Sequence, residues 1–226
     1  MKKTIIIVAA HPDDEVLGCG GTIARLSKQG SKINTLILAE GITSRDKIRN
    51  RSKRQKQIEN LRKQGKLASK DVGAKSITYL DYPDNQMDTV PLLNIIKDIE
   101  KFILKFKPDT IFTHFDNDMN IDHTIANKAT LTAARSKPGT KIKKIYAFEI
   151  MSSTYYNPSA NFIPNYHINI DKFLKTKLRA LKRYKNEIEK FPHPRSLEAV
   201  SALAKFRGSN VGFSCAESFM LLREIF

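Results

Sequence analysis

Short β-branched runs alternate along this sequence with longer stretches of helical periodicity, and this alternation limits the folds that the chain can adopt. Residues 5–10 form a continuous apolar run, and residues 33–39 and 76–80 are further candidates for buried strands. The clearest amphipathic segment is 91–107, whose apolar side chains recur at helical spacing. Strands that alternate with helices indicate right-handed βαβ crossovers and a mostly parallel sheet covered on both faces.

The other expected elements follow the same pattern and then become less regular. They are a helix over 22–29 opened by Gly20-Gly21, a strand over 110–114, a helix over 122–135, a strand over 145–150, a short strand over 167–170, a basic helix over 171–190, and a helix from Ser196 to Phe206. The glycine pair favours close helix–strand packing, because the full dinucleotide fingerprint of a phosphate cradle is absent. We therefore predict one α/β domain over residues 1–226 with a C-terminal extension.

Composition excludes several classes of protein. The chain has 226 residues, of which 41% are hydrophobic and 27% charged, so it is long enough and apolar enough for a globular core. No apolar stretch approaches the ~20 residues that span a bilayer, and the polar residues 11–14 cut the first apolar run short of a secretory signal. The only cysteines, Cys19 and Cys215, are too few for a disulfide scaffold. We expect a cytoplasmic protein without integral membrane contact.

The charge is strongly basic, with 39 Lys+Arg against 23 Asp+Glu and a formal net charge of +16. The basic residues gather in two segments, 45–75 and 172–185. They are consistent with solvated helix faces, with steering of an anionic substrate, or with binding of nucleic acid phosphates. Because no zinc knuckle, RNP-type aromatic motif or helix-turn-helix signature is present, we expect no nucleic acid partner.

Acidic and histidine side chains follow two of the predicted strands. The run His11-Pro12-Asp13-Asp14-Glu15 comes directly after the first strand, and residues 116–123, which end in His123, follow the strand at 110–114. Ligands of open parallel sheets collect at the carboxyl ends of the strands. A mixed set of imidazoles and carboxylates suits a divalent metal such as zinc, with one carboxylate as ligand and its neighbour as base. Alternatively, Asp13 merely caps a helix and His123 is a surface residue.

The sequence resembles a known family along nearly its whole length. The segment Ala10-His11-Pro12-Asp13-Asp14-Glu15 is similar to the signature of the LmbE-like, or PIG-L-type, zinc-dependent N-deacetylases. Further elements that resemble the family are the segments 81–85, 113–114, 120–123, 191–196, 207–208 and 216–217. The resemblance implies a Rossmann-like three-layer sandwich. It also implies that His11, Asp14 and His123 bind Zn²⁺, or another divalent metal, and that Asp13 is the general base.

The resemblance also suggests substrate-binding residues. It implies that Asp84 contacts sugar hydroxyls, although the same residue could form an Asx-turn with Asn85. Many relatives have a histidine where this chain has Asn120, and an amide can donate a hydrogen bond but cannot act as an acid at neutral pH. His193 is a candidate to replace that histidine.

Two further charged residues complete the candidate site. Arg195 could bind a phosphate or carboxylate of the substrate, or pair with Glu217 to hold the C-terminal segment. Asp122, which directly precedes a predicted metal ligand, is expected to orient a histidine.

The function that this resemblance implies is hydrolysis of an N-acetyl group from an amino sugar. We expect a small-molecule substrate that is nucleotide-, phospho- or glycan-linked, as in surface-glycan biosynthesis. One alternative is a deacetylase of a thiol-cofactor precursor such as malate-linked N-acetylglucosamine. Another is a non-catalytic anion- or nucleic-acid-binding domain, and a homo-oligomer is compatible with each of these functions.

Overall fold

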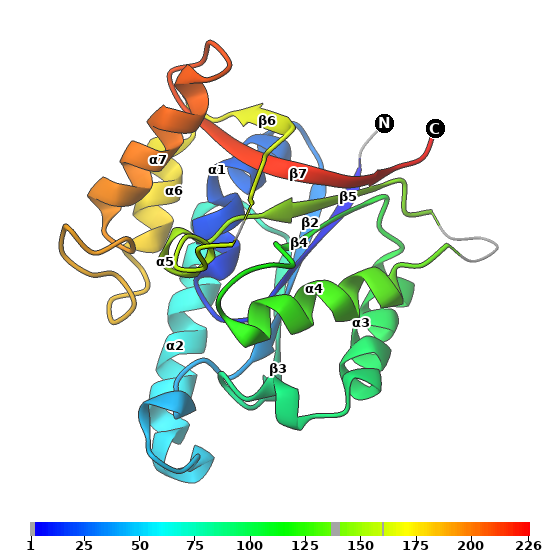
Figure 1. The fold of residues 1–226 in the computed structure, drawn as a ribbon, viewed down its shortest axis with the longest axis vertical. Coiled ribbons are helices and arrows are strands. Elements are labelled where there is room, and N and C mark those ends of the chain that lie inside the picture. Colours follow the sequence, from blue (N-terminus) through cyan, green and yellow to red (C-terminus); the bar gives the residue numbers. More distant parts are fainter. Residues whose placement is uncertain (1–2, 137–140, 160) are drawn as a thin grey trace.

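A single mixed sheet runs through the protein. The structure, a computed structural model, describes residues 3–136, 141–159 and 161–226. Its seven strands have the order β3-β2-β1-β4-β5-β7-β6 (Figure 1). Their bounds are β1 Thr4–Ala9, β2 Lys32–Ala39, β3 Ser76–Tyr82, β4 Thr110–His114, β5 Lys144–Phe148, β6 Tyr166–Asn169 and β7 Ala216–Glu224.

The strand order reverses direction next to the first strand. β1 pairs in parallel with β2 on one side and with β4 on the other, and β3 and β5 extend the two halves in parallel. β7 then pairs antiparallel with both β5 and β6. The predicted mostly parallel sheet is confirmed. The gap between the carboxyl ends of β1 and β4 is the kind of position where α/β folds bind ligands.

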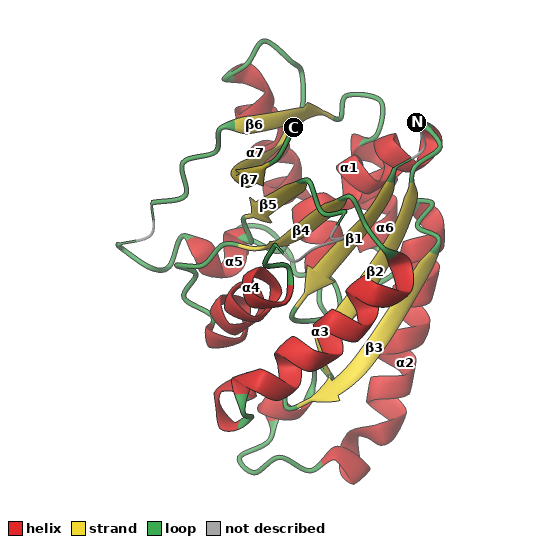
Figure 2. Ribbon diagram, turned by 90° about the vertical axis from the view of Figure 1, so that its right-hand side faces the viewer, coloured by secondary structure: helices red, strands yellow, loops and turns green. Residues whose placement is uncertain are grey.

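Helices cover both faces of this sheet, as the side view of Figure 2 shows. The α-helices are α1 Asp14–Lys28, α2 Arg51–Asp71, α3 Leu92–Phe106, α4 Ile121–Ala133, α5 Met151–Thr154, α6 Leu174–Leu181 and α7 Leu197–Ser209, with short 3₁₀ turns at Thr43–Arg45 and Met87–Thr89. Side chains of α1, α2 and α6 share one hydrophobic core, and those of α3 and α4 share the other. These are the three layers of the expected sandwich.

The position of β1 in the fold explains why its sequence is apolar without interruption. Ile5, Ile7 and Ala9 pack into the core under α1, whereas Ile6 and Val8 pack into the core under α3 and α4. A strand between two helical layers buries both of its faces, so successive side chains all need to be apolar. The run ends where the sheet ends and the polar loop begins.

The expected start of the first helix was wrong. α1 begins at Asp14, so that Gly20 and Gly21 lie in its middle and not before its first turn. A Cβ atom on Gly21 would lie 2.8 Å from the side chain of Ile170. The glycines are therefore needed for close packing across the helix, as predicted, although their place in the helix differs from the one expected.

The long basic helix expected over 171–190 was also wrong. α6 ends at Leu181, and after it Tyr184 and Glu187 turn into the protein, where both are buried. The expected helix after Ser196 is confirmed, because the Ser196 hydroxyl accepts a hydrogen bond from the Ala199 amide at 3.0 Å. In the parts of the chain that the structure describes, no helix is long and apolar enough to cross a membrane.

Candidate metal centre

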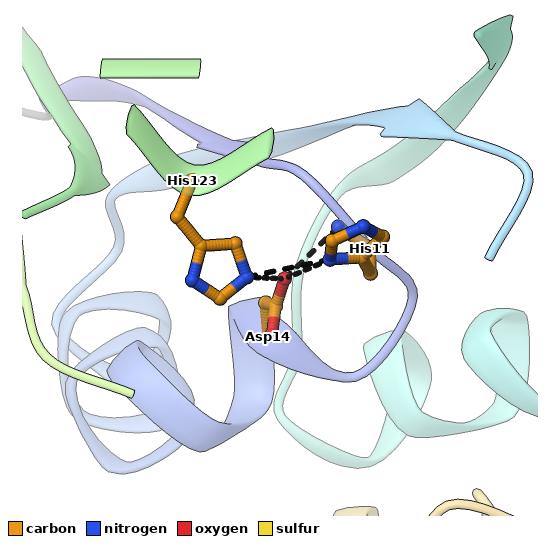
Figure 3. A group of neighbouring side chains, drawn as sticks. All are labelled: His11, Asp14 and His123. Atoms are coloured by element: carbon orange, nitrogen blue, oxygen red, sulfur yellow. Dashed lines mark hydrogen bonds and ion pairs between the residues drawn. The ribbon is translucent and has the colours of Figure 1, made fainter. Parts of the chain in front are cut away.

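Three side chains from two distant segments meet at the edge where the strand order reverses. His11 lies in the loop after β1, Asp14 begins α1, and His123 lies in the first turn of α4. Figure 3 shows the two imidazoles and the carboxylate pointing toward one another. All three residues are buried, with at most 7% of their surface exposed. The sheet topology therefore joins loops that are over a hundred residues apart.

The distances between these side chains fit a divalent cation. Asp14 Oδ2 lies 3.3 Å from His11 Nδ1 and 3.2 Å from His123 Nε2, and the two nitrogens are 3.3 Å apart. Tetrahedral zinc with ligand distances of about 2.0–2.1 Å places its ligand atoms about 3.3 Å from one another. The three atoms are thus spaced as three corners of such a tetrahedron, which leaves the fourth position open.

The outer nitrogens of both imidazoles face carboxylates. His11 Nε2 lies 3.0 Å from Asp122 Oδ2, and His123 Nδ1 lies 3.2 Å from Asp118 Oδ1. Each outer nitrogen donates its proton to the carboxylate beside it in the tautomer that this geometry favours. The inner nitrogens then present their lone pairs to the same point as the Asp14 carboxylate. These three electron-rich atoms repel one another unless a cation lies between them.

The electrostatics of the pocket also favour a bound cation. Burial opposes charge on His11 and His123, but the surrounding carboxylates outweigh it and raise the pKa of both imidazoles. Burial also opposes ionisation of Asp14, yet the neighbouring histidines hold its pKa well below the usual range. The carboxylates around the two imidazoles therefore favour positive charge between them, and Asp14 remains ionised as a ligand for a cation.

Asp13 has a different environment from its neighbour. It is 1% exposed, and neither carboxylate oxygen accepts a hydrogen bond from the described residues. A cation, Arg195, approaches with Nη1 3.4 Å from Asp13 Oδ2. Burial raises the pKa of Asp13, and Arg195 partly offsets this effect. Its side chain makes no helix-capping hydrogen bond, so this carboxylate is available for another partner.

The sequence analysis missed two residues of this centre. Asp118 faces His123 and accepts hydrogen bonds from Thr154 Oγ1 at 2.5 Å and the Asn120 amide at 2.9 Å. His114, at the end of β4, stacks on His123 with ring centroids 3.9 Å apart, and its Nε2 accepts from the Ala10 amide. The signal for Asp118 was its place in the acidic segment 116–123.

Asp122 and Asp84 border the centre on its other side. The Asp122 carboxylate accepts hydrogen bonds from the amides of Asn85 at 2.7 Å and Met87 at 3.0 Å, in addition to its contact with His11. Asp84 Oδ1 lies 3.5 Å from His11 Nε2, and its Oδ2 accepts from the amide and hydroxyl of Ser44. The structure therefore brings both residues to the site.

Asn120 serves the helix that carries His123. Its Oδ1 accepts from the Asp122 amide at 2.9 Å, which caps α4, and its Nδ2 donates to Asn85 Oδ1 at 2.8 Å. Its side chain is thus engaged within the protein.

Arg195 and His193 lie at the mouth of the centre. Besides Asp13, Arg195 contacts Ser152 Oγ at 3.1 Å and Glu187 Oε2 at 3.5 Å. The suggested pairing of Arg195 with Glu217 is wrong, because Glu217 binds the buried ammonium of Lys177 at 2.6 Å.

An open pocket lies at this mouth. It has a volume of about 430 Å³, and its lining includes Arg45, Glu187, His193 and Arg195. His193 Nδ1 accepts a hydrogen bond from the Arg195 amide at 3.1 Å. Since Arg195 also contacts Asp13, this pocket adjoins the predicted base.

Comparisons with known proteins agree with this geometry. Residues 6–134, more than half of the chain, match the model of the PIG-L family, described as GlcNAc-PI de-N-acetylase. The chain is 26% identical over 191 residues to the uncharacterized deacetylase YaiS of Escherichia coli K12, covering 82% of this chain and 92% of that protein. It is also 26% identical over 191 residues to the probable N-acetyl-alpha-D-glucosaminyl L-malate deacetylase 2 of Bacillus cereus, covering 84% and 86% respectively.

Among solved structures, GalB, the 4-carboxy-2-hydroxymuconate hydratase of Pseudomonas putida KT2440, has a TM-score of 0.78. Its identity is 21%, and the match covers 100% of this chain and 98% of that one. At this identity the likeness shows a shared fold, and one fold can serve several reactions. The chemistry of this chain is therefore argued from its site.

Proposed function

Because this chain belongs to the PIG-L family of GlcNAc-PI de-N-acetylases, we propose that it is a metal-dependent hydrolase that removes the N-acetyl group from an amino sugar. The observation that carries the proposal is the triangle of His11 Nδ1, Asp14 Oδ2 and His123 Nε2, whose atoms lie 3.2–3.3 Å apart. The buried Asp13, whose oxygens accept no hydrogen bond from the described residues, lies beside this triangle.

Zn²⁺ is the proposed ion, held by His11, Asp14 and His123, because a His₂Asp set with an open position is typical of catalytic zinc. When bound, the ion acidifies water and polarises the acetamide carbonyl. Asp13 takes the proton of the attacking water and returns it to the departing amine. Asp122 and Asp118 hold the two imidazoles in the tautomers that binding requires.

The substrate is proposed to be an N-acetylated amino sugar that carries a nucleotide, a phosphate or a glycan. Asp84 and Asn120 are the proposed contacts to the sugar, supported by the distance of 3.5 Å from Asp84 to His11 and by the hydrogen bond from Asn120 to Asn85. His193 and Arg195 line the pocket beside Asp13 and are the proposed contacts to its substituent. The cationic side chains of this pocket support an anionic substituent on the sugar, since guanidinium groups bind carboxylates and phosphates in a bidentate manner.

A second candidate substrate is N-acetylglucosamine linked to malate. Its support is the similarity to the Bacillus cereus protein named for that substrate. Malate would place two carboxylates near Arg195 and Arg45. Comparing kcat/KM for a malate-linked and a nucleotide-linked N-acetylglucosamine discriminates between the two proposals.

Two further aspects of the proposal concern the whole chain. One sheet takes strands from residues 4–9 and from residues 216–224, which supports a single domain over residues 1–226. The low cysteine content supports a reducing, cytoplasmic location. No nucleic acid or integral membrane partner is part of this proposal.

The test is acetate release from a panel of N-acetylhexosamine derivatives, measured with and without a chelator. We expect release from at least one derivative, loss of release on chelation, and recovery when zinc is added back. Release that persists after complete removal of metal contradicts the role of the metal, and absence of release from the whole panel contradicts the substrate class.

A further inference from the structure

Two basic segments that lie about a hundred residues apart in the sequence form one surface. α2 and α6 cover the same face of the sheet (Figures 1 and 2). Asp71, at the end of α2, joins them, since its carboxylate lies 2.7 Å from Arg183 Nε and 3.6 Å from Arg179 Nε. We call six of the solvent-exposed lysines of these two helices and the turn after α6 the basic face: Lys56, Lys63, Lys66, Lys70, Lys175 and Lys182. Lys53, in the first turn of α2, is also exposed but pairs with Asp46 at 2.9 Å, so it is not counted.

The lysines of the basic face lack carboxylate partners. Among the residues that the structure describes, none of the six forms an ion pair. Two of the three lysines of α3, on the opposite face of the sheet, differ. Lys97 lies 2.9 Å from Glu100 Oε2, and Lys101 lies 2.9 Å from Asp98 Oδ1. α2 and α6 together carry eleven Lys and Arg against two acids, whereas α3 carries three Lys against two acids, so the positive charge is denser on the side of α2 and α6.

This concentration of like charge lowers the stability of α2. Lys63 and Lys66 are three residues apart on the exposed side of the helix, and Lys66 and Lys70 are four apart. Like charges at these spacings destabilise a helix. Neither pair contributes to the stability of the fold, whereas an anionic partner bound across them would relieve the repulsion.

The chemistry of the basic face indicates which anion it fits. Neither α2 nor α6 contains an aromatic residue, and stacking on aromatic rings is the usual means of holding single-stranded nucleic acid bases. Leu67 is the only large apolar side chain of α2 and α6 that is strongly exposed, whereas helices that lie in a membrane surface insert a row of apolar side chains. Lysine is a compact, hydrated point charge suited to the well-separated anionic groups of a hydrated polymer.

The basic face also leads to the candidate active site. α2 begins beside Arg49, whose Nε lies 2.7 Å from the buried Glu40 at the carboxyl edge of the sheet. The chain after α6 reaches the same edge, where Tyr184 binds Glu15 and Glu187 binds Arg45 at 2.8 Å. A polymer that lies along α2 and α6 therefore ends at the pocket beside Asp13.

We propose that the basic face binds a strand of an anionic polysaccharide and that this strand presents its N-acetylated sugar to the site. The second half of this statement rests on the proposed deacetylase function, and the first half does not. The anionic groups are carboxylates, phosphates or sulfates spaced along the glycan, each bound by one or two lysines.

The probe is heparin, titrated against the full chain at several salt concentrations. In the variant K63E/K66E/K70E we expect the affinity to fall by about tenfold or more and the salt dependence to weaken, because fewer counterions are released. The control is K97E/K101E/K105E, which makes the same change in net charge on the opposite face and should lower the affinity by about threefold or less. The neutral variant K63Q/K66Q/K70Q repeats the test without charge reversal, and thermal melting checks that each variant is folded.

Several outcomes overturn the proposal. Equal losses in the two charge-reversed variants mean that net charge alone attracts heparin. An unchanged affinity in K63E/K66E/K70E means that heparin binds elsewhere. Tighter binding of duplex DNA, or of phosphatidylserine vesicles, that is lost only in K63E/K66E/K70E assigns the face to nucleic acid or to a membrane. Turnover of a small N-acetylated sugar should be the same in both variants, so a failure of the deacetylase proposal appears there and not in heparin binding.

Discussion

Asp13 combines burial, a carboxylate that accepts no hydrogen bond from the described residues, and an unusual backbone conformation. Its φ of 106° is in a region that side chains other than glycine rarely adopt, and such conformations cost about 1–3 kcal/mol. The surrounding structure holds it there, because the Asp13 amide donates to Glu15 Oε2 at 3.0 Å and its carbonyl accepts from Leu17. These two hydrogen bonds thus fix the strained backbone of the residue that is the predicted base.

The first prediction concerns this carboxylate. Replacement of Asp13 by Asn retains its size but removes its ability to accept a proton. We expect kcat to fall by about 10²–10⁴-fold, the range of general acid–base catalysis, while the zinc content stays at that of the parent protein. Steady-state kinetics and metal analysis check this. An Asn variant with near-parental kcat would show that another group is the base.

The second prediction concerns the support of Asp13. Tyr184 is fully buried, and its hydroxyl donates to Glu15 Oε1 at 2.5 Å, while the other Glu15 oxygen holds the Asp13 amide. Burial raises the pKa of Glu15 to about 7, although the hydrogen bond from Tyr184 opposes this. Tyr184→Phe releases one end of Glu15, so we expect kcat to fall by roughly 10- to 100-fold through misplacement of Asp13, with little change in KM.

The control for Tyr184→Phe is Tyr156→Phe, at an exposed position. The expected pattern includes an unchanged zinc content and rescue of Glu15→Ala by Glu15→Gln, whose amide oxygen can still accept from the Asp13 amide. If Tyr184→Phe lowers thermal stability but leaves kcat intact, Tyr184 has a structural role only.

Much of the centre could be predicted from single residues. Polar side chains at the ends of buried strands are costly unless they serve a site, and this pattern indicates a metal site at the loops after the first and fourth strands. The family resemblance implies which residues would hold the ion, His11, Asp14 and His123, and the structure brings these three together. The functional roles of these residues stay predictions. Asp118 could not be singled out within an acidic segment, since nothing in the sequence shows which carboxylate faces the outer nitrogen of His123.

At the scale of elements, a buried ion pair joins three parts of the fold. Glu217 of β7 accepts hydrogen bonds from the amides of Gly21 at 2.9 Å and Thr22 at 2.6 Å, within α1. The Lys177 ammonium of α6 lies 2.6 Å from Glu217 and donates to the Leu17 carbonyl. α1, α6 and β7 are thus linked through one carboxylate.

The third prediction is that Glu217→Ala destabilises the protein strongly. Removal of one partner leaves the Lys177 charge buried and unpaired, which costs about 3–5 kcal/mol. Replacement of both partners, as Lys177→Met with Glu217→Leu, should recover part of this loss because no charge then remains. Urea denaturation measures both free energies of unfolding. A double variant that is no more stable than Glu217→Ala would contradict this explanation.

Element boundaries were the least predictable part of the fold. A Gly-Gly pair usually marks the end of an element, but here Ile170, about 150 residues away, requires glycine inside α1. In the same way the basic helical pattern after residue 171 continues beyond the point where Tyr184 and Glu187 turn inward to meet Glu15 and Arg45. Both errors come from contacts between distant segments, which local periodicity does not contain.

At the scale of the molecule, the candidate metal centre connects the two halves of the sheet. His11 and Asp14 belong to the half that contains β1, β2 and β3, and His123 follows β4 of the other half. An ion bound by all three adds a link between segments that are otherwise joined by strand pairing and packing. Its binding energy therefore contributes to the stability of the whole fold.

The fourth prediction follows from this link. A ligand present at 1,000 times its Kd stabilises the folded state by about 4.1 kcal/mol, which for a chain of this size raises Tm by roughly 10 °C. We expect a chelator to lower Tm by about this amount and zinc to restore it. Below neutral pH the effect should shrink, because protons compete for the histidine ligands. The control is His123→Ala, which lacks one ligand and whose Tm should change less with either reagent. If neither the chelator nor zinc changes the Tm of the parent protein, these residues do not bind a metal.

The distribution of charge over the molecule could be predicted from the sequence only in part. The excess of +16 and its two clusters are visible in the sequence. That the clusters meet on one face, beside the mouth of the site, follows only from the packing of α6 against α2 and from the pairing of Asp71 with Arg183. The sequence does not show how far apart two remote segments lie or which way they face, because the fold determines both.

The place of β7 in the sheet has a consequence for biosynthesis. β6 is hydrogen-bonded to β7 and is separated by it from β5, so residues 166–169 have no neighbour in the sheet until residues 216–224 arrive. On the ribosome, the parallel strands and the metal loop are therefore complete well before the antiparallel edge can form. A nascent chain halted before residue 216 would expose the flank of β5, where chaperones or aggregation would compete with correct closure.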